Sequence, residues 1–415
     1  MKKLIMLTAA FAALVTEAAL TVTDVTARQR WPWNSLVDVD FTVNGNEGEA
    51  YAIDISATAA GGDKKLCATS FDTEPIAASG KRTRIVWNLG ADYPNFKADD
   101  LEVTVTATPF SDATPVYLVV DISGGMSAAS WPVRYTTTAP VHTVGQNDPC
   151  KTTELWLKRV KAGTIMMGKS IYYTCTLTND YYLGVFSVTQ DQIVRMGYNA
   201  SNSGDHGCSF TNTLYRATRP ADSCKYAGLR GSYYNPANES TFTPSSGVLK
   251  NLNDRTGLSF DLPTQWQWEY ACRAGSTPGS TAAWYDGCTA NDFRHKGNSK
   301  PTQNYEWYSE QGMWSEDYGT SYVDRYTPNP WGFYGMLGNV REVCVNAPTT
   351  MTIGDTVFEP QGAESSSRYQ LGKGGYWGDA YTSATSYVNT DVDPWNSTLF
   401  YWGARICLTI KKKAE

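Results

Sequence analysis

Alternation of apolar and polar residues along the first hundred positions constrains this chain more than any other feature of its sequence. Side chains of an extended strand point to opposite faces in turn, so a period of two gathers the apolar residues on one face. Turn-forming pairs such as Asn44-Gly45 and Gly61-Gly62 separate the alternating runs. We therefore expect residues 20–110 to form a small, immunoglobulin-like β-sandwich. The apolar members of the clearest runs are Val37, Val39, Phe41 and Val43, then Tyr51, Ile53, Ile55 and Ala57, then Leu101, Val103, Val105 and Ala107.

The N-terminus has the pattern of a secretory signal. Two lysines lie in residues 1–3, and an apolar run follows over residues 4–15. Small residues come next and suit cleavage, while the apolar run is too short to cross a bilayer. A buried N-terminal helix is the alternative. We expect a signal peptide at residues 1–19, no transmembrane segment, and a mature protein that is secreted, periplasmic or at the cell surface.

Composition limits the partners and the chemistry. The 415 residues hold 35 Lys plus Arg and 41 Asp plus Glu, a net charge of −6, so no basic stripe is implied and nucleic acid is not expected as a partner. There are 14 Trp, 26 Tyr and 35 Gly but 3 His. This composition favours short strands, turns and aromatic surfaces over a helical enzyme with a histidine-based site. We interpret His142, His206 and His295 as scattered surface or loop residues.

Nine cysteines are present, and their number is odd. Export permits disulfides, and an odd number leaves at least one thiol unpaired or paired between chains. The spacing does not fix the connectivity, although a bridge between Cys272 and Cys288 is one candidate. The alternative for several of these cysteines is a small buried side chain.

Residues 111–415 predict a second domain of another kind. We assign the apolar strand 116–120 to it, so the boundary falls after residue 110. Two helices are marked by capping boxes, in which a Thr side chain caps the helix and a Gln three positions later reaches back. The remainder predicts turns and short strands. The two boxes pair Thr189 with Gln192 and Thr264 with Gln267.

Five short motifs follow one another in this second region. Residues 262–271 read Leu-Pro-Thr-Gln-Trp-Gln-Trp-Glu-Tyr-Ala, and residues 338–342 read Gly-Asn-Val-Arg-Glu. The set resembles the formylglycine-generating enzyme family, also called sulfatase-modifying factor domains, whose motifs include Leu-Pro-Thr-Glu-Ala-Glu-Trp-Glu-Tyr-Ala and Gly-Asn-Val-Trp-Glu. The resemblance implies a C-type-lectin-like fold with little regular secondary structure, and thus an α+β chain in which a β-sandwich precedes this domain. The five segments are 161–168, 182–190, 262–273, 329–342, and 374–377 with 403–405.

The resemblance implies an oxidase that converts a cysteine of a target sulfatase to formylglycine, using O₂ and Cu(I) held by two thiolates. The positions that match the family's two cysteines are Asp379 and Ala384 here, and the nearest thiols, Cys344 and Cys407, lie in other motifs. We therefore predict that copper oxidase activity is absent. The alternative is a formylglycine-generating oxidase with a displaced or altered site. Related sulfoxide synthases use iron held by closely spaced histidines, a pattern that this sequence lacks.

The resemblance also implies a structural calcium ion at the Gly-Asn-x-x-Glu segment. Asn339 and Glu342 supply the hard oxygen ligands that this ion prefers, and backbone carbonyls would complete its shell. The alternative is that both side chains only hydrogen-bond a tight loop. Gly335, which replaces the family's usual Asp, favours that alternative.

Residues 376–402 form an aromatic and polar segment between the Gly-Gly and Gly-x-Arg motifs. Rigid aromatic rings beside short hydrogen-bonding side chains are typical of a binding surface. The segment is similar to ligand-binding parts of lectin-like folds, including the hypervariable ends of retroelement-diversified proteins. We predict an exported module that binds a protein or glycan ligand through Tyr376, Trp377, Asp379 and Tyr381. The alternative for the tryptophans is the core, and it applies to Trp377, Trp395 and Trp402.

Overall fold

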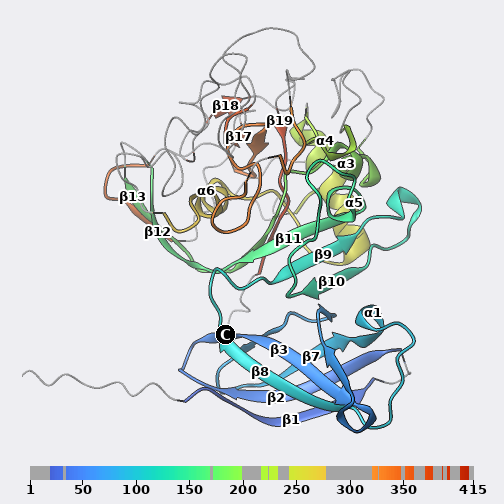
Figure 1. The fold of residues 1–415 in the computed structure, drawn as a ribbon. Coiled ribbons are helices and arrows are strands. Elements are labelled where there is room, and N and C mark those ends of the chain that lie inside the picture. The colour runs from blue at the N-terminus through green and yellow to red at the C-terminus, as the bar shows by residue number, and fades with distance from the viewer. Residues whose placement is uncertain are drawn as a thin grey trace, which may run out of the picture. The chain divides into compact units, whose positions relative to one another are not determined.

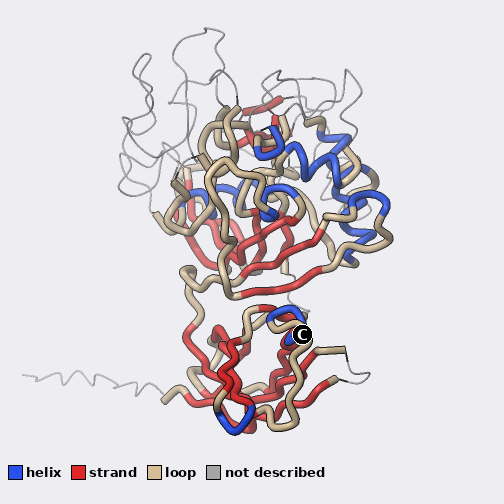
Figure 2. The backbone as a smooth tube through the Cα atoms, turned by 45° about the vertical axis from the view of Figure 1, so that its right-hand side comes forward, coloured by secondary structure: helices blue, strands red, loops and turns tan. Residues whose placement is uncertain are grey.

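The chain divides into two compact units, Met1–Phe110 and Ser111–Glu415 (Figure 1). We name them the N-unit and the C-unit. The structure is a computed structural model with few helices, and its class is α+β, as the sequence predicts. Strands and loops make up most of the described part of both units (Figure 2). The described residues are 19–30, 34–168, 172–198, 216–222, 224–231, 243–276, 320–325, 327–346, 351–358, 370–376, 386, 390–392 and 402–410.

Two antiparallel sheets build the N-unit. The first has the strand order β1-β2-β7-β5, and the second has β3 at its centre, with β8 on one side and β4 and β6 on the other. A short helix, α1 (Leu89–Asp92), follows β7. The strands are β1 (Thr21–Gln29), β2 (Leu36–Asn44), β3 (Ala50–Ala59), β4 (Lys64–Cys67), β5 (Ser70–Phe71), β6 (Ile76–Ala78), β7 (Arg82–Asn88) and β8 (Glu102–Pro109).

The predicted alternation is buried as expected on two of its three runs. On β2 the four apolar residues from Val37 to Val43 are at most 3% exposed, and on β3 the four from Tyr51 to Ala57 are also at most 3% exposed. The third run behaves differently: on β8 only Val105 is buried, and its apolar neighbours along the run are half-buried. The pattern therefore identifies the strands, but it does not tell a central strand from one that pairs on a single side.

The largest sheet of the C-unit has the antiparallel order β10-β9-β11-β14-β20. Its strand β9 covers residues 117–120 of the apolar segment 116–120 that the sequence assigned to this region, and it pairs with β10 on one side and β11 on the other. The strands are β9 (Tyr117–Asp121), β10 (Val133–Thr136), β11 (Glu154–Val160), β14 (Tyr181–Gly184) and β20 (Cys407–Thr409).

Two smaller sheets complete the described part of the C-unit. One has the order β12-β13-β16, and the other has the order β18-β17-β15-β19, which joins segments from two of the five motifs. The strands are β12 (Gly163–Met167), β13 (Tyr173–Leu177), β15 (Arg341–Val343), β16 (Thr356–Phe358), β17 (Gln370–Lys373), β18 (Thr390–Val392) and β19 (Trp402–Gly403).

Both predicted capping boxes are confirmed. They begin α3 and α6, where each Thr hydroxyl accepts a hydrogen bond from the backbone of its Gln and each Gln side chain accepts one in return. Helix α5 lacks such a box at Ser246, and the sequence analysis missed it. No helix among the residues described here is long and apolar enough to cross a membrane. The helices are α2 (Pro149–Thr152), α3 (Gln190–Arg195), α4 (Tyr226–Leu229), α5 (Gly247–Thr256) and α6 (Gln265–Arg273).

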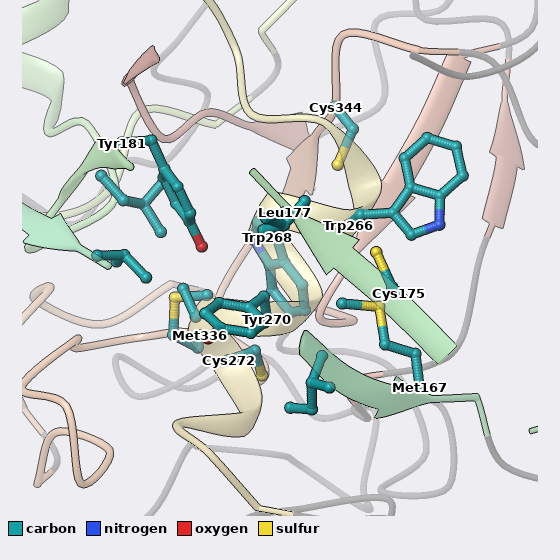
Figure 3. Close-up of a cluster of buried hydrophobic side chains, with 14 of the residues drawn as sticks. Met167, Cys175, Leu177, Tyr181, Trp266, Trp268, Tyr270, Cys272, Met336 and Cys344 are labelled. Atoms are coloured by element: carbon teal, nitrogen blue, oxygen red, sulfur yellow. The ribbon is translucent and has the colours of Figure 1, made fainter. Parts of the chain in front are cut away.

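Helix α6 lies in the hydrophobic core of the C-unit (Figure 3). Trp266 and Trp268 are at most 1% exposed, and they pack with side chains of β12, β13 and β14. The hydroxyl of Tyr181 on β14 donates to the carbonyl of Gln267 at 2.7 Å. Burial raises the pKa of Tyr181 well above its ordinary value. This core therefore fixes α6 rigidly, and α6 in turn carries three of the polar side chains described next, Trp268, Glu269 and Arg273.

Candidate functional site

The buried carboxylate of Glu342 connects four segments of the C-unit. Glu342 on β15 has no exposed surface, and its two oxygens accept hydrogen bonds from Ser187 Oγ and Trp268 Nε1, each at 2.6 Å. The Nε of Arg405, just beyond β19, donates to both oxygens at 3.1 and 2.9 Å. An isolated buried carboxylate costs several kcal/mol of desolvation, and these donors offset that cost.

Arg405 extends the same network to the backbone. Its Nη1 donates to the carbonyls of Gly184 and Val185 at 2.7 and 3.0 Å, and its Nη2 donates to the carbonyl of Tyr334 at 2.6 Å. The side chain is fully buried. Because a guanidinium presents its donors in a fixed fork, it holds these segments in one arrangement.

A second buried network starts from α6 and reaches β17. Glu269 accepts from Arg273 Nε at 2.9 Å and from Lys373 Nζ at 2.9 Å. Lys373 also donates to the carbonyl of Ser386 at 3.0 Å, a residue inside the segment 376–402. Burial alone would raise the pKa of Glu269, but the positive charges of Lys373 and Arg273 outweigh it and lower that pKa. The Glu269 carboxylate thus stays charged and holds Lys373, which in turn binds the backbone of the segment 376–402 at Ser386.

Two glycines lead into the segment 376–402. Gly374 and Gly375 have φ values of +88° and +74°, in the left-handed region that favours glycine. A Cβ at Gly374 would lie 2.5 Å from the carbonyl oxygen of Met336. The carbonyl of Gly374 accepts a hydrogen bond from the Gly338 amide at 2.7 Å. The Gly-Gly motif is therefore needed for a close backbone crossing directly before Tyr376.

One arginine brings the two ends of this segment together. The guanidinium of Arg341 on β15 lies 5.3 Å from the ring centre of Tyr376 and 5.8 Å from that of Trp402. Arg341 is 7% exposed and Trp402 is fully buried. The first and last residues of the segment 376–402 thus both lie against the same side chain. Arg341 is not predicted as a site residue from the sequence, although it occupies the position of the Trp in the family's Gly-Asn-Val-Trp-Glu motif.

The structure describes one of the four predicted ligand-binding residues. Tyr376 is half-buried against Arg341. Trp377, Asp379 and Tyr381 lie outside the described residues. Of the three tryptophans for which the core was the alternative, Trp402 is in the core, and the other two lie outside the described residues.

The two predicted calcium ligands have other partners in this structure. Asn339 exchanges two hydrogen bonds with the backbone of Ser321, at 2.9 and 3.2 Å, and Glu342 is held by Arg405. A Ca²⁺ ion at Glu342 would have to displace the Arg405 guanidinium. Among the residues that the structure describes, no group of three His, Cys, Asp or Glu side chains could hold a metal ion. Calcium at these two residues stays a prediction.

The thiols nearest to the family's copper position are poorly suited to hold metal. Cys344 and Cys407 are at most 2% exposed. Burial raises the pKa of Cys344, which disfavours the thiolate that copper would need. Cys272 is buried, and its candidate disulfide partner, Cys288, lies outside the described residues.

The loop residue His142 has partners that the sequence did not predict. It lies in a loop, but its side chain is 12% exposed and has two partners, Asp324 Oδ2 at 2.9 Å and the hydroxyl of Tyr334 at 3.3 Å. Lys151 also donates to Asp324, at 2.6 Å. Burial alone would raise the pKa of Asp324, but these hydrogen bonds lower it. The cluster links α2 to the loop before β15. His206 and His295 lie outside the described residues.

A comparison with protein families shows which family the domain with these two buried networks belongs to. The family model described as "Sulfatase-modifying factor enzyme 1-like domain" matches residues 146–406. The chain belongs to this family. The match contains both buried networks and all five motifs, so the resemblance stated from the sequence is confirmed. Within the sulfatase-modifying factor domain, the Gly-Asn-x-x-Glu and Gly-x-Arg motifs serve to pair Glu342 with Arg405.

Similar proteins extend this comparison. The "Chaperone protein LppX" of Paenibacillus barcinonensis is 26% identical over 203 residues, which are 45% of this chain and 69% of that protein. Among solved structures, variable protein 1 of Treponema denticola is 19% identical with a TM-score of 0.44, over 65% of this chain and 99% of that one. PvdO from Pseudomonas aeruginosa is 16% identical with a TM-score of 0.44, over 65% of this chain and 100% of that one.

Proposed function

We propose that this chain is an exported protein whose sulfatase-modifying factor domain lacks copper oxidase activity and binds a protein or glycan ligand through the segment 376–402. The proposal rests on one observation: the rings of Tyr376 and Trp402 both lie against the guanidinium of Arg341. A rigid frame holds both ends of a segment rich in Tyr, Trp, Asn, Ser and Asp. Such a segment supplies contact area and hydrogen bonds at a low cost in conformational entropy.

The chemistry of the cysteines supports a role without catalysis. Asp379 and Ala384 stand where the family's two copper-binding thiols would be, and neither side chain can bind Cu(I) as a thiolate does. The described thiols of this region are buried, as Cys344 shows. A relative named as a chaperone agrees with protein binding as one form of this role.

Two measurements test the proposal. Purified protein given Cu(I), O₂ and a peptide containing Cys-x-Pro-x-Arg should form no aldehyde detectable by mass spectrometry. Formylglycine in that peptide would overturn the proposal in favour of an oxidase with a displaced site.

The binding role is tested on glycan and peptide arrays. We expect a ligand whose binding is lost in Tyr381→Ala and weakened in Tyr376→Ala, but kept in Tyr172→Ala, a half-buried tyrosine outside the segment. Unchanged binding in both segment variants would refute the proposed surface, as would the absence of any ligand.

A further inference from the structure

The N-unit contains a hollow of about 440 Å³ that no part of the proposed function uses. It lies between the end of β1 and the loop over residues 93–99, and its volume is in the range of sites for small molecules. Val37 and Leu89, which are 3% and 9% exposed, give it an apolar floor. The hollow thus combines a buried base with walls from two separate parts of the N-unit.

The loop wall is held at both of its ends. Asp92 accepts hydrogen bonds from the Thr69 amide and from Trp87 Nε1, both at 2.8 Å. Asp100 accepts from the amides of Ala60 and Gly61 at 3.0 and 2.8 Å. These anchors fix the loop before any ligand arrives, which reduces the entropy lost on binding.

Two aromatic rings in this loop are also fixed in place. Tyr93 and Phe96 are half-buried, with ring centres 6.4 Å apart and tilted by 57°. The Tyr93 hydroxyl exchanges hydrogen bonds with the backbone of Cys67, at 2.9 and 3.3 Å, and the Lys64 ammonium lies 5.3 Å from the Phe96 ring centre. A sugar ring has apolar C–H faces and polar edges, and it suits an aromatic wall with polar groups at the rim.

The rim of the hollow carries more positive than negative charge. Arg28 and Lys97 line it together with Asp99. Arg28 has a side chain that is 64% exposed, and Asp38 lies 3.6 Å from its guanidinium. Arg30, also on this side of Asp38, binds that carboxylate at 2.7 Å. Because Asp38 is only 4% exposed, the charges that face solvent beside it are guanidinium groups. A ligand with one negative charge complements this rim, whereas Asp99 would repel a dianion.

We propose that this hollow binds an acidic saccharide, with the sugar ring against Tyr93 and Phe96 and its carboxylate or sulfate at Arg28 and Lys97. Asp99 and Gln29 line the same rim and suit the sugar hydroxyls. A nucleotide could also use aromatic rings and cations, but its phosphate carries about two charges next to Asp99. This site is separate from the segment 376–402 and does not depend on the function proposed for it.

Titration calorimetry on the full chain tests the proposal, using methyl glucuronide, methyl glucoside and AMP. The two glycosides differ at the carboxylate, so we expect the glucuronide to bind about tenfold more tightly. Arg28→Gln and Lys97→Gln should each remove most of that preference. Phe96→Ala should weaken both glycosides by a similar factor.

Matched controls show whether the glucuronide binds at this hollow or elsewhere on the chain. Arg82→Gln changes an exposed arginine of the same sheet that does not line the hollow, and it should leave glucuronide binding unchanged. Tyr381→Ala in the C-unit should also have no effect. The proposal is wrong if the glucuronide does not bind, if the glucoside or AMP binds as tightly, or if Arg82→Gln weakens binding as much as Arg28→Gln.

Discussion

The two units of this protein bury different chemistry. In the described part of the N-unit the buried side chains are almost all apolar, and Asp38 is the one charged residue among them. The C-unit buries Glu342 with Arg405 and Glu269 with Lys373. The N-unit therefore depends mainly on the removal of apolar surface from water, whereas the C-unit also depends on charges that are unfavourable unless each keeps its partner.

This difference follows from the amount of regular structure. The strands of the N-unit satisfy their backbone groups through ladders, so its sheets need few polar side chains inside. Much of the described part of the C-unit is loop, and backbone carbonyls outside regular pairing, such as those of Val185 and Tyr334, need donors from side chains. Buried arginines supply these donors. A fold with little regular secondary structure thus relies on buried ion pairs to hold its loops. Four predictions test this contrast between the two units.

The largest effect is expected from Glu342→Gln. This change leaves the Arg405 guanidinium buried without its counter-charge, which costs about 3 to 5 kcal/mol of unfolding free energy. Denaturant unfolding measures the loss. The control is Glu154→Gln, because Glu154 pairs with Arg134 where both side chains are partly exposed, and about 1 kcal/mol or less is expected there. Equal losses in the two variants would show that the C-unit does not depend on its buried pair.

In the N-unit, a substitution that removes buried apolar volume should lower the unfolding free energy by a similar amount. Ile53 is fully buried, so Ile53→Ala should cost about 2 to 5 kcal/mol of unfolding free energy through lost burial and a residual cavity. Its exposed neighbour Asp54 faces the other side of β3, and Asp54→Ala should change stability by about 0.5 kcal/mol or less. Comparable losses, again by denaturant unfolding, would contradict the assignment of the two faces.

Two glycines with similar positive φ values distinguish the cost of backbone strain from the cost of steric crowding. Gly48 has φ of +77° and no atom near its missing Cβ, so Gly48→Ala should cost about 1 to 2 kcal/mol of stability. Gly374 has φ of +88°, but a Cβ there would lie 2.5 Å from a carbonyl oxygen. We expect Gly374→Ala to lower the melting temperature more than Gly48→Ala does. The reverse order would mean that the crossing before Tyr376 can move aside.

The smallest effect is a pH dependence of stability. The folded-state pKa of Glu269 is lowered, so its contribution is complete above the ordinary pKa of about 4.5 and is lost as the pH falls toward the folded-state value. Each unit of the shift corresponds to about 1.4 kcal/mol. The stability of Glu269→Gln should therefore depend less steeply on pH between 5 and 3 than that of the natural protein. Asp254→Asn, which removes an exposed carboxylate paired with the exposed Lys250, should keep the steeper dependence.

Several parts of the architecture could be predicted because local sequence controls them. The alternation on β2 and β3 fixes which side chains are buried, since each side chain's face depends only on its position along the strand. The capping boxes at Thr189 and Thr264 likewise depend on residues three positions apart. Helix α5 has no such local signal at its start, and it was missed.

The candidate site could be predicted only in part. The motifs indicated where the segment 376–402 begins and ends, but Arg341 was not selected because no local pattern assigns an arginine to two distant rings. The role of Glu342 was also not identified. The sequence offered its carboxylate as a metal ligand, whereas the fold places a guanidinium 2.9 Å from it.

The sequence by itself determined the family and the strand and helix signals, and it carries the prediction that the two copper-binding cysteines are absent. These features depend on residue types or on spacings of a few positions. The tertiary structure alone decided which charges are paired, which aromatic rings share Arg341, and that residues 28 and 97 line one hollow. Pairing of this kind joins residues that are tens to hundreds of positions apart, and only the folded chain brings them within reach of one another.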